Sequence, residues 1–279
     1  MKKKLVMALL VCSMTATMLA GCGGKEEEDE KASKDSPQKI TVAVGSNFKP
    51  YVYVDENDQP AGYDVEVLKA VDEKLEQYEF EFQSMDFKNI LLSVESNKAQ
   101  IGSQQFEINE ERQKKYLYAD EDFAKFVAYL IVSKDNNEVK SLEDLAGKSI
   151  TLPTADNTEK VINEFNEEHP DHPIEIKWVD NPSREEQVAS LENGTWDAYN
   201  AIPVVIKEMN EEFGDKIKAV GEPLSVTSSY FLYNKDQKEL KEAVDGALKE
   251  LKEEGKLSEI SMDTLGVDIT KDDGGMSEE

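Results

Sequence analysis

The chain of 279 residues has few cysteines, arginines and histidines, and each shortage excludes a kind of chemistry. Its two cysteines, Cys12 and Cys22, both lie near the N-terminus. The rest of the chain therefore has no thiol for a disulfide bond, a zinc cluster or a cysteine nucleophile. It also has no Gly-rich phosphate loop and no second apolar run of membrane-spanning length. The two histidines, His169 and His172, lie in a loop flanked by prolines, where we expect no metal site.

Positive charge is scarce as well. The 59 acidic residues outnumber the 32 lysines and arginines, which gives a formal net charge of −27. Removal of residues 1–21 would take away three lysines and no acid, so the charge would become −30. Such a charge repels phosphate backbones and anionic lipid surfaces. We therefore expect no nucleic-acid partner.

The first 24 residues have the features of an export signal. Lys2–Lys4 form a basic start, residues 5–19 form an apolar run that is short for a bilayer span, and Leu19–Gly21 place small residues before Cys22. This resembles a bacterial lipoprotein signal, which implies export, cleavage of residues 1–21 and attachment of lipid to the Cys22 sulfur. An ordinary signal peptide and a short membrane helix are the alternatives. We expect an extracytoplasmic protein that is lipid-anchored to the cell membrane.

Composition divides the rest of the chain into a tether, a body and a tail. Residues 22–38 are acidic and have no large apolar side chain, which predicts a flexible tether. The polar tail, residues 269–279, is expected to be frayed over its last part, Lys271–Glu279. The roughly 230 residues between them are enough for two small lobes.

Strand and helix patterns alternate within the body, and the series occurs twice. The expected elements are strands at 40–44, 78–82, 149–152 and 174–178 and helices at 64–77, 89–96, 158–165 and 184–191. This pattern indicates an α/β protein with two lobes.

A weak internal repeat supports the two lobes. Residues 93–100 and 190–197 align at an offset of 97 residues, and each has the pattern of a helix end, a turn and the start of a strand. The repeat places Gln104–Phe106 and Ala201–Pro203 at the ends of equivalent strands. Ligands of open α/β sheets bind beyond the carboxyl ends of strands, so the two lobes are expected to enclose a cleft.

Several short motifs then resemble, in order, those of the family 3 extracellular solute-binding proteins. They are Phe48–Tyr51, Gly62–Val67, Asp86–Phe87, Ile108–Lys115, Leu142–Lys148 and Gly221–Leu224. The resemblance covers about residues 40–266 and implies a periplasmic-binding-protein-like fold, in which two α/β lobes joined by two hinge strands close on one ligand. It also implies an amino-acid ligand and an ABC permease as partners. Residues 86–118 look closest to Gram-positive lipoproteins that bind cystine and related sulfur amino acids, with another polar amino acid such as glutamine next.

The family topology implies where the chain changes lobe. The first lobe takes residues 39–127 and 227–268, and the second takes residues 128–226. The crossover segments Phe126–Val132 and Val226–Tyr233 have the composition of strands. The helix Glu239–Leu257 is expected to pack on the first lobe, and ligand contacts in both lobes to favour hinge closure.

Arg112 is the main candidate for a ligand contact. The chain has thirty lysines and two arginines, Arg112 and Arg184. A guanidinium pairs with a carboxylate through two parallel hydrogen bonds, which an ammonium cannot replace well. The resemblance implies that Arg112 holds the ligand's α-carboxylate, whereas the alternative is a surface arginine that pairs with Glu110 or Glu111. Arg184 is expected to be solvated.

Asn157 and Thr158 are the candidates on the second lobe. They precede an expected helix, whose free N–H groups suit a carboxylate. The resemblance places a Gly-Thr-Thr turn here, which implies that Thr158 and the backbone around Asn157 hold the ligand carboxylate. A simple helix cap is the alternative. Phe48 and Phe87 match positions of aromatic walls around the ligand, although either could be plain core.

A further group of candidates occupies the strand end that the internal repeat identifies in the first lobe. They are Gln104, Gln105, Phe106 and Glu107. Glu107 stands where the family has a hydroxyl, and Ile202 stands where many members have an aspartate for the α-ammonium. We therefore predict that Glu107, or alternatively Asp197, pairs with the ammonium group. The bulky polar side chains favour a polar ligand.

Two other functions remain open at this stage. An enzyme of the same fold, such as a dehydratase, would need an acid or base in the cleft, and Glu107 is the candidate. A ligand-sensing surface lipoprotein without transport is the other. We favour a monomeric binding protein with no catalytic residue, cofactor or metal.

Overall fold

The computed structural model describes residues 36–276 except 109, 154–155, 157 and 180–181. The predicted signal peptide, Cys22 and most of the predicted tether lie outside the described residues. No helix in the described part of the chain is long and apolar enough to cross a membrane.

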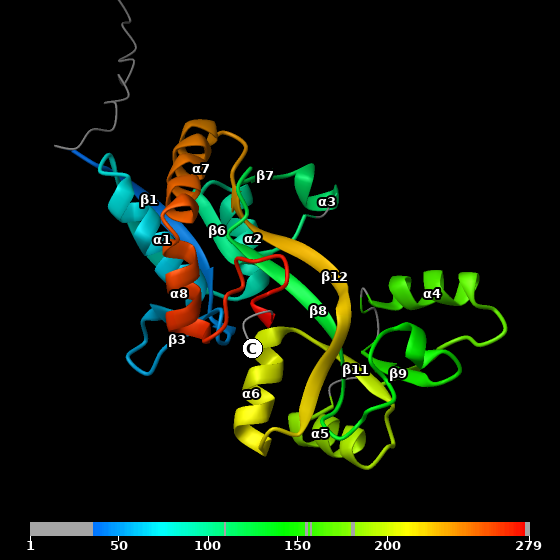
Figure 1. Cartoon of the computed structure of the whole chain (residues 1–279). Coiled ribbons are helices and arrows are strands. Elements are labelled where there is room, and N and C mark those ends of the chain that lie inside the picture. The colour runs from blue at the N-terminus through cyan, green and yellow to red at the C-terminus, as the bar shows by residue number, and fades with distance from the viewer. Residues whose placement is uncertain (1–35, 109, 154–155, 157, 180–181, 277–279) are drawn as a thin grey trace, which may run out of the picture. The chain divides into compact units, whose positions relative to one another are not determined.

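One sheet of nine strands runs through the described residues (Figure 1). Its strands are β1 (Gln38–Gly45), β5 (Tyr78–Met85), β6 (Ile101–Phe106), β7 (Leu117–Tyr118), β8 (Ala124–Ser133), β9 (Ser149–Leu152), β10 (Glu175–Trp178), β11 (Ala198–Ala201) and β12 (Ile217–Tyr233). The order is β10-β9-β11-β8-β12-β6-β1-β5, and β7 pairs with β12. A small sheet holds β2 (Asn47–Phe48), β3 (Val52–Val54) and β4 (Pro60–Ala61).

Helices follow most of these strands along the chain. They are α1 (Tyr63–Lys74), α2 (Phe87–Glu95), α3 (Glu110–Gln113), α4 (Thr158–Glu168), α5 (Arg184–Glu192), α6 (Pro203–Phe213), α7 (Lys238–Glu253) and α8 (Lys256–Leu265), with a 3₁₀ turn at Glu143–Leu145.

The large sheet has two similar halves. Parallel β5-β1-β6 form the centre of what we call the first lobe, and parallel β10-β9-β11 form that of the second lobe. β6 begins at Ile101 and β11 begins at Ala198, 97 residues later, and each is the last parallel strand before the antiparallel pair β8 and β12. The internal repeat therefore corresponds to equivalent strands. The predicted α/β class with two lobes is confirmed.

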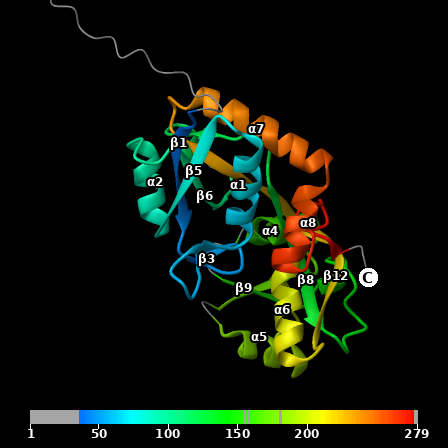
Figure 2. The ribbon, with the colours of Figure 1, turned by 90° about the vertical axis from the view of Figure 1, so that its left-hand side faces the viewer.

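Helices cover both faces of the first-lobe sheet (Figure 2). Val42 and Val44 of β1 belong to the core that includes residues of α1, α7 and α8, whereas Ala43 belongs to a cluster with Ile90 and Val94 of α2. A parallel strand covered on both faces is apolar along its length, which explains why β1 is recognisable in the sequence.

Three features of the fold differ from the prediction or were missed. The predicted C-terminal helix is two helices, because Gly255 adopts a left-handed conformation (φ 74°) between α7 and α8. Helix α6 was not predicted, although Pro203 at its first turn is a typical start signal. The small sheet of β2, β3 and β4 has strands too short to show an alternating pattern.

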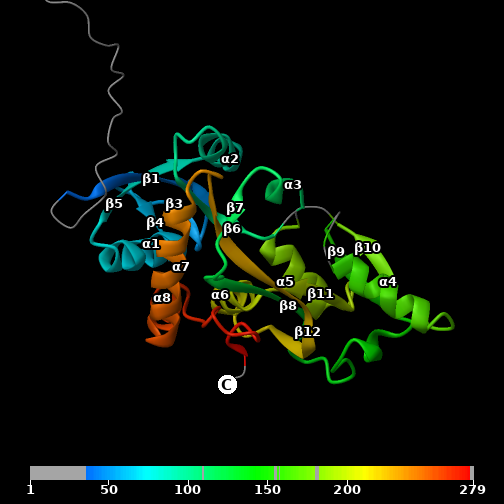
Figure 3. The ribbon, with the colours of Figure 1, turned by 90° about the horizontal axis from the view of Figure 1, so that it is seen from above.

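β8 and β12 run side by side between the two lobes (Figure 3). Phe126 packs against the first-lobe core, and its neighbour Val127 belongs to a second-lobe core. Their partners on β12 are Thr227 and Val226. The predicted crossover strands are confirmed, and the lobe boundaries after residues 127 and 226 remain a prediction.

The segment after α8, residues 266–276, forms a third connection that we call the C-terminal strap. Ile269 is buried in the first-lobe core, whereas Met276 packs against a second-lobe core. The hydroxyl of Tyr129 on β8 donates to the main-chain oxygen of Asp273 (2.9 Å). A side chain at Gly274 would come within 3.0 Å of a neighbouring proline. The prediction of a frayed tail is thus wrong up to residue 276, because a few apolar and small residues pack among the polar ones.

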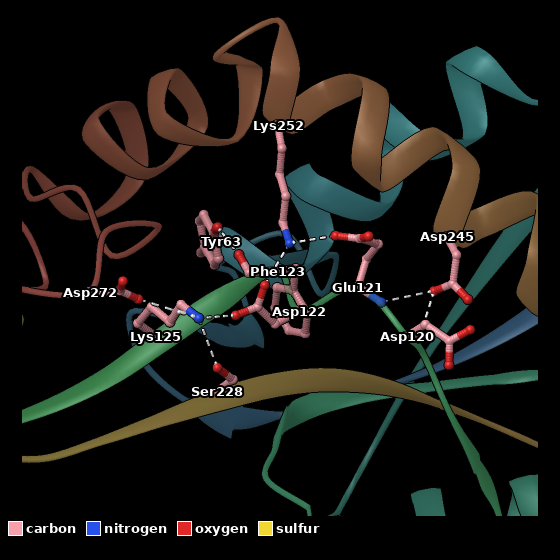
Figure 4. Close-up of polar contacts among 10 residues, drawn as sticks. All are labelled: Tyr63, Asp120, Glu121, Asp122, Phe123, Lys125, Ser228, Asp245, Lys252 and Asp272. Atoms are coloured by element: carbon pink, nitrogen blue, oxygen red, sulfur yellow. Dashed lines mark hydrogen bonds and ion pairs between the residues drawn. The ribbon is translucent and has the colours of Figure 1, made fainter.

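Lys125 joins all three connecting segments (Figure 4). From β8, its Nζ pairs with Asp122 (2.5 Å) and with Asp272 of the strap (3.5 Å) and donates to Ser228 of β12 (3.1 Å). Its main-chain N–H donates to the oxygen of Ile269 (2.7 Å). The start of β8 is thereby fixed to β12 and to the strap at one point.

Helix α7 fixes the segment that leads into β8 (Figure 4). One carboxylate oxygen of Asp245 accepts the main-chain N–H of Asp120 (3.0 Å) and of Glu121 (3.4 Å). Lys252, about two helical turns further along the same face of α7, pairs with Glu121 (2.9 Å) and Asp122 (2.5 Å). These contacts anchor the crossover to the first lobe.

Replacing Tyr129 by phenylalanine should lower the free energy of unfolding by about 1 kcal/mol, because it removes the hydrogen bond to the strap. Urea denaturation would measure the change. Tyr53→Phe, at a half-buried tyrosine of β3, is the matched control and should leave stability unchanged. Equal stabilities of Tyr129→Phe and wild type would mean that the strap contact contributes nothing in solution.

Candidate functional site

A cavity of about 330 Å³ lies where the carboxyl ends of β6 and β11 meet the two crossover strands. Glu107, directly after β6, and Ile202, directly after β11, both line it. Phe126 of β8 and Thr227 of β12 line the side of the cavity that the two crossover strands form. The volume is in the range of small-molecule sites, and the position is the one predicted from the strand ends.

The second-lobe wall is built around the start of α4. Asp156 caps this helix, because its Oδ1 accepts the main-chain N–H of Thr158 (2.8 Å). Asn200 of β11 donates to both carboxylate oxygens of Asp156 (3.0 and 3.1 Å) and to the hydroxyl of Thr158 (2.8 Å). All three line the cavity, and Thr158 is 1% exposed. Asn157, the neighbouring candidate, lies outside the described residues.

The first lobe has a similar arrangement at the start of α1. Ser103 of β6 donates its hydroxyl to Asp64 (2.6 Å), as Asn200 of β11 donates to Asp156, and Ser103 and Asn200 are 97 residues apart. Ser103 and Asn200 therefore occupy equivalent positions of the internal repeat. The repeat could have identified Asn200 from the sequence. Each lobe uses a strand side chain to fix an acid at a helix start.

Gln105 belongs to this first-lobe arrangement and does not line the cavity. It adopts a left-handed backbone conformation (φ 48°) and its Nε2 donates to Asp64 (2.6 Å). Burial raises the pKa of Asp64 from 3.8 to about 6, although hydrogen bonds from Ser103 and Gln105 oppose the rise. Gln105 thus fixes the strand end that presents Glu107. The neighbouring Gln104 is half-buried, and its Oε1 has no hydrogen-bond partner among the described residues.

Glu107 faces the cavity from the first lobe. Its Oε1 accepts the hydroxyl of Thr227 (2.6 Å), and its main-chain oxygen accepts the hydroxyl of Tyr118 (3.1 Å). Asp197, the alternative partner for a ligand ammonium, does not line this cavity. It instead accepts both the N–H and the hydroxyl of Ser149 (2.9 and 2.5 Å).

Arg112 lies beside the end of β6 on an aromatic platform. The centre of its guanidinium is 5.4 Å from the ring centroid of Phe87 and 5.6 Å from that of Phe106. It also donates to the main-chain oxygen of Glu107 (3.4 Å). Phe106 is buried in the core, whereas Phe87 is 39% exposed. The structure therefore brings four predicted residues together, although only Glu107 of the four lines the cavity.

Phe48 reaches the cavity wall through a chain of aromatic rings. It stacks on Tyr51 at a centroid distance of 5.1 Å, and Tyr51 lies 5.8 Å from Phe126. Phe126 lines the cavity. Tyr51 is buried between the rings of Phe48 and Phe126, so it supports Phe126 in the cavity wall.

Arg184 differs from its prediction. It forms an ion pair with Glu208 (2.6 Å) that links α5 to α6, and it is not merely solvated. The sequence could not reveal this pair, because the two residues are 24 positions apart on different helices.

The family comparison covers both lobes and the cavity between the strand ends. The family described as "Bacterial extracellular solute-binding proteins, family 3" matches residues 40–266. The chain belongs to this family. The resemblance predicted from the sequence motifs is confirmed, and the family places the protein outside the cytoplasm.

Relatives of this family 3 protein align over almost its whole length. The L-cystine-binding protein TcyK of Bacillus subtilis is 32% identical and covers 98% of this chain and 99% of its own. The L-cystine-binding protein TcyJ of the same organism is 31% identical and covers 94% of this chain and 96% of its own. The crystal structure of the "probable amino-acid ABC transporter extracellular-binding protein ytmK" of Bacillus subtilis shares 32% identity with a TM-score of 0.71, and covers 83% of this chain and 99% of its own. The predicted similarity to Gram-positive cystine-binding proteins is confirmed.

Proposed function

We propose that this protein is the substrate-binding component of an ABC importer for amino acids, and that it captures L-cystine or a related sulfur amino acid for the membrane permease. The main observation in support is the polar cavity at the ends of β6 and β11. It belongs to a family 3 protein that is similar along its length to two L-cystine-binding proteins. Binding without turnover is the function that these relatives favour over an enzymatic one.

Each ligand group has a proposed partner in the first lobe. Arg112 pairs with an α-carboxylate, and its contacts with two aromatic rings restrict the guanidinium, so that less rotamer freedom is lost on pairing. Glu107, on the cavity wall, accepts the α-ammonium. Gln104 lies outside the cavity lining with its Oε1 buried, and it supports the strand end. Phe87 contacts the side chain of the ligand.

Other candidates have supporting roles in this proposal. Thr158 and the main chain at the start of α4 hold a carboxylate from the second lobe, where the positive end of the helix dipole favours it. Phe48 supports the wall through Tyr51, and the buried Gln105 and Phe106 hold the strand end and the aromatic platform.

The location of the protein is a further part of the proposal. Cleavage of residues 1–21 would leave Cys22 as a lipid-bearing N-terminus, with the acidic segment 22–38 as a tether. A monomer held in this way beside a permease remains free to open and close. Globomycin, an inhibitor of lipoprotein signal cleavage, should block maturation, and Cys22→Ala should prevent metabolic labelling with palmitate.

A thermal-shift experiment tests the proposed ligand. L-Cystine at about ten times its dissociation constant should stabilise the protein by about 1.4 kcal/mol and raise the melting temperature by about 3–6 °C. L-Glutamine and L-cysteine are the comparison ligands, and the cystine should be recovered unchanged by mass spectrometry. The proposed ligand class is wrong if no sulfur amino acid shifts the transition, and consumption of the cystine would indicate an enzyme.

A further inference from the structure

The cavity contains two carboxylates and no cationic side chain among its described lining residues. Glu107 comes from the first lobe and Asp156 from the second. The other lining side chains are hydroxyls, amides, aromatic rings and aliphatic groups. An amino acid with a single ammonium group matches Glu107 and leaves the charge of Asp156 without a ligand partner.

Asp156 is held in a fixed position before any ligand arrives. The carboxylate accepts two N–H···O contacts from Asn200 and one from the main chain of Thr158, and these three contacts orient it at the start of α4. Asn200 also holds the hydroxyl of Thr158, so the acid and the hydroxyl are oriented together. A carboxylate that is oriented in this way on a cavity wall is suited to bind a cation at low entropic cost.

The two acids line the cavity from different lobes. Glu107 follows β6 and is fixed to β12 through Thr227, and Asp156 is fixed to β11 through Asn200. Because β6 and β11 are equivalent strands of different lobes, a ligand that reaches both acids contacts both lobes at once.

We infer that Asp156 binds a second ammonium group, so that the cavity selects bis-amino acids of the cystine type over amino acids with one ammonium. This inference rests on the proposed function. One half of such a ligand pairs with Glu107 in the first lobe, and the other half pairs with Asp156 in the second. Each half carries its own carboxylate, for which Arg112 and the start of α4 provide the partners.

Calorimetry with two disulfides tests the inference. The probes are L-cystine and the mixed disulfide of L-cysteine with 3-mercaptopropionic acid, which lacks one ammonium group. The wild-type protein should bind L-cystine at least tenfold more tightly. Asp156→Asn removes the charge and retains a good helix cap. It should bind L-cystine at least tenfold more weakly than wild type does, and should bind the mixed disulfide within twofold of wild type.

Glu168→Gln is the matched control, because it removes one charge from helix α4 at an exposed side chain that lines neither the 330 Å³ cavity nor the neighbouring hollow beside Asp156. It should leave both affinities within twofold of wild type. Equal weakening of both disulfides by Asp156→Asn would make Asp156 only a helix cap and would overturn the inference. Equal affinities of wild type for the two disulfides would also overturn it and would leave the proposed function standing. Binding of neither disulfide would overturn both.

Discussion

Replacing Arg112 by lysine should weaken amino-acid binding at least 100-fold, which corresponds to about 2.7 kcal/mol. Lysine keeps the charge but loses the planar pair of donors that matches a carboxylate. It also changes the cation–π contacts of the guanidinium with Phe87 and Phe106. Calorimetric titration with L-cystine measures the affinity, and denaturation of the free protein establishes that the variant is folded.

The second arginine provides the control for this experiment. Arg184 pairs with Glu208 between α5 and α6, and it does not line the cavity. Arg184→Lys should therefore bind L-cystine within twofold of the wild type. If Arg112→Lys and Arg184→Lys bind equally well, Arg112 is a surface arginine and the carboxylate has another partner.

Lowering the pH from 7.5 to 4.5 should stabilise the wild type by about 2 kcal/mol relative to an Asp64→Asn variant. The pKa of Asp64 is about 6 in the folded protein and near its ordinary 3.8 in the unfolded chain. The folded state therefore binds the proton first as the pH falls. The stabilising contribution is complete below pH 3.8 and is lost as the pH rises through 6. Urea denaturation of both proteins at the two pH values measures it.

Ser103→Ala sharpens this test. The hydroxyl of Ser103 donates to Asp64 and lowers its pKa, so its removal should raise the pKa and enlarge the stabilisation at low pH. Identical pH dependence of the wild type and Asp64→Asn would show that Asp64 has an ordinary pKa.

The α/β fold was predictable because its strands are buried on both faces. β1 and β9 stand out as short apolar runs, and the offset of 97 residues then identifies β6 and β11 as equivalent. The C-terminal strap was not predictable from composition. Its packing depends on Met276 and Gly274 among charged neighbours, and their contacts lie far away in the sequence.

The candidate site was only partly predictable, for a similar reason. Strand alternation places Ser103 and Gln105 on the same face of β6, so the inward direction of Gln105 could have been inferred. The sequence does not show that Asp64 lies opposite that face. The sequence indicated a helix start at Asn157 and Thr158, but the place of the neighbouring Asp156 on the cavity wall depends on how β11 and α4 come together.

The C-terminal strap has a fixed length. Only seven residue steps separate Ile269, in the core of one lobe, from Met276, against the core of the other. A chain of seven residues spans at most about 25 Å when fully extended. Wider separation of its two ends would require Met276 to leave its place, so the strap is expected to limit how far the lobes can separate while both ends stay packed. A limit on how far the lobes open also limits the conformational entropy that is lost when they close.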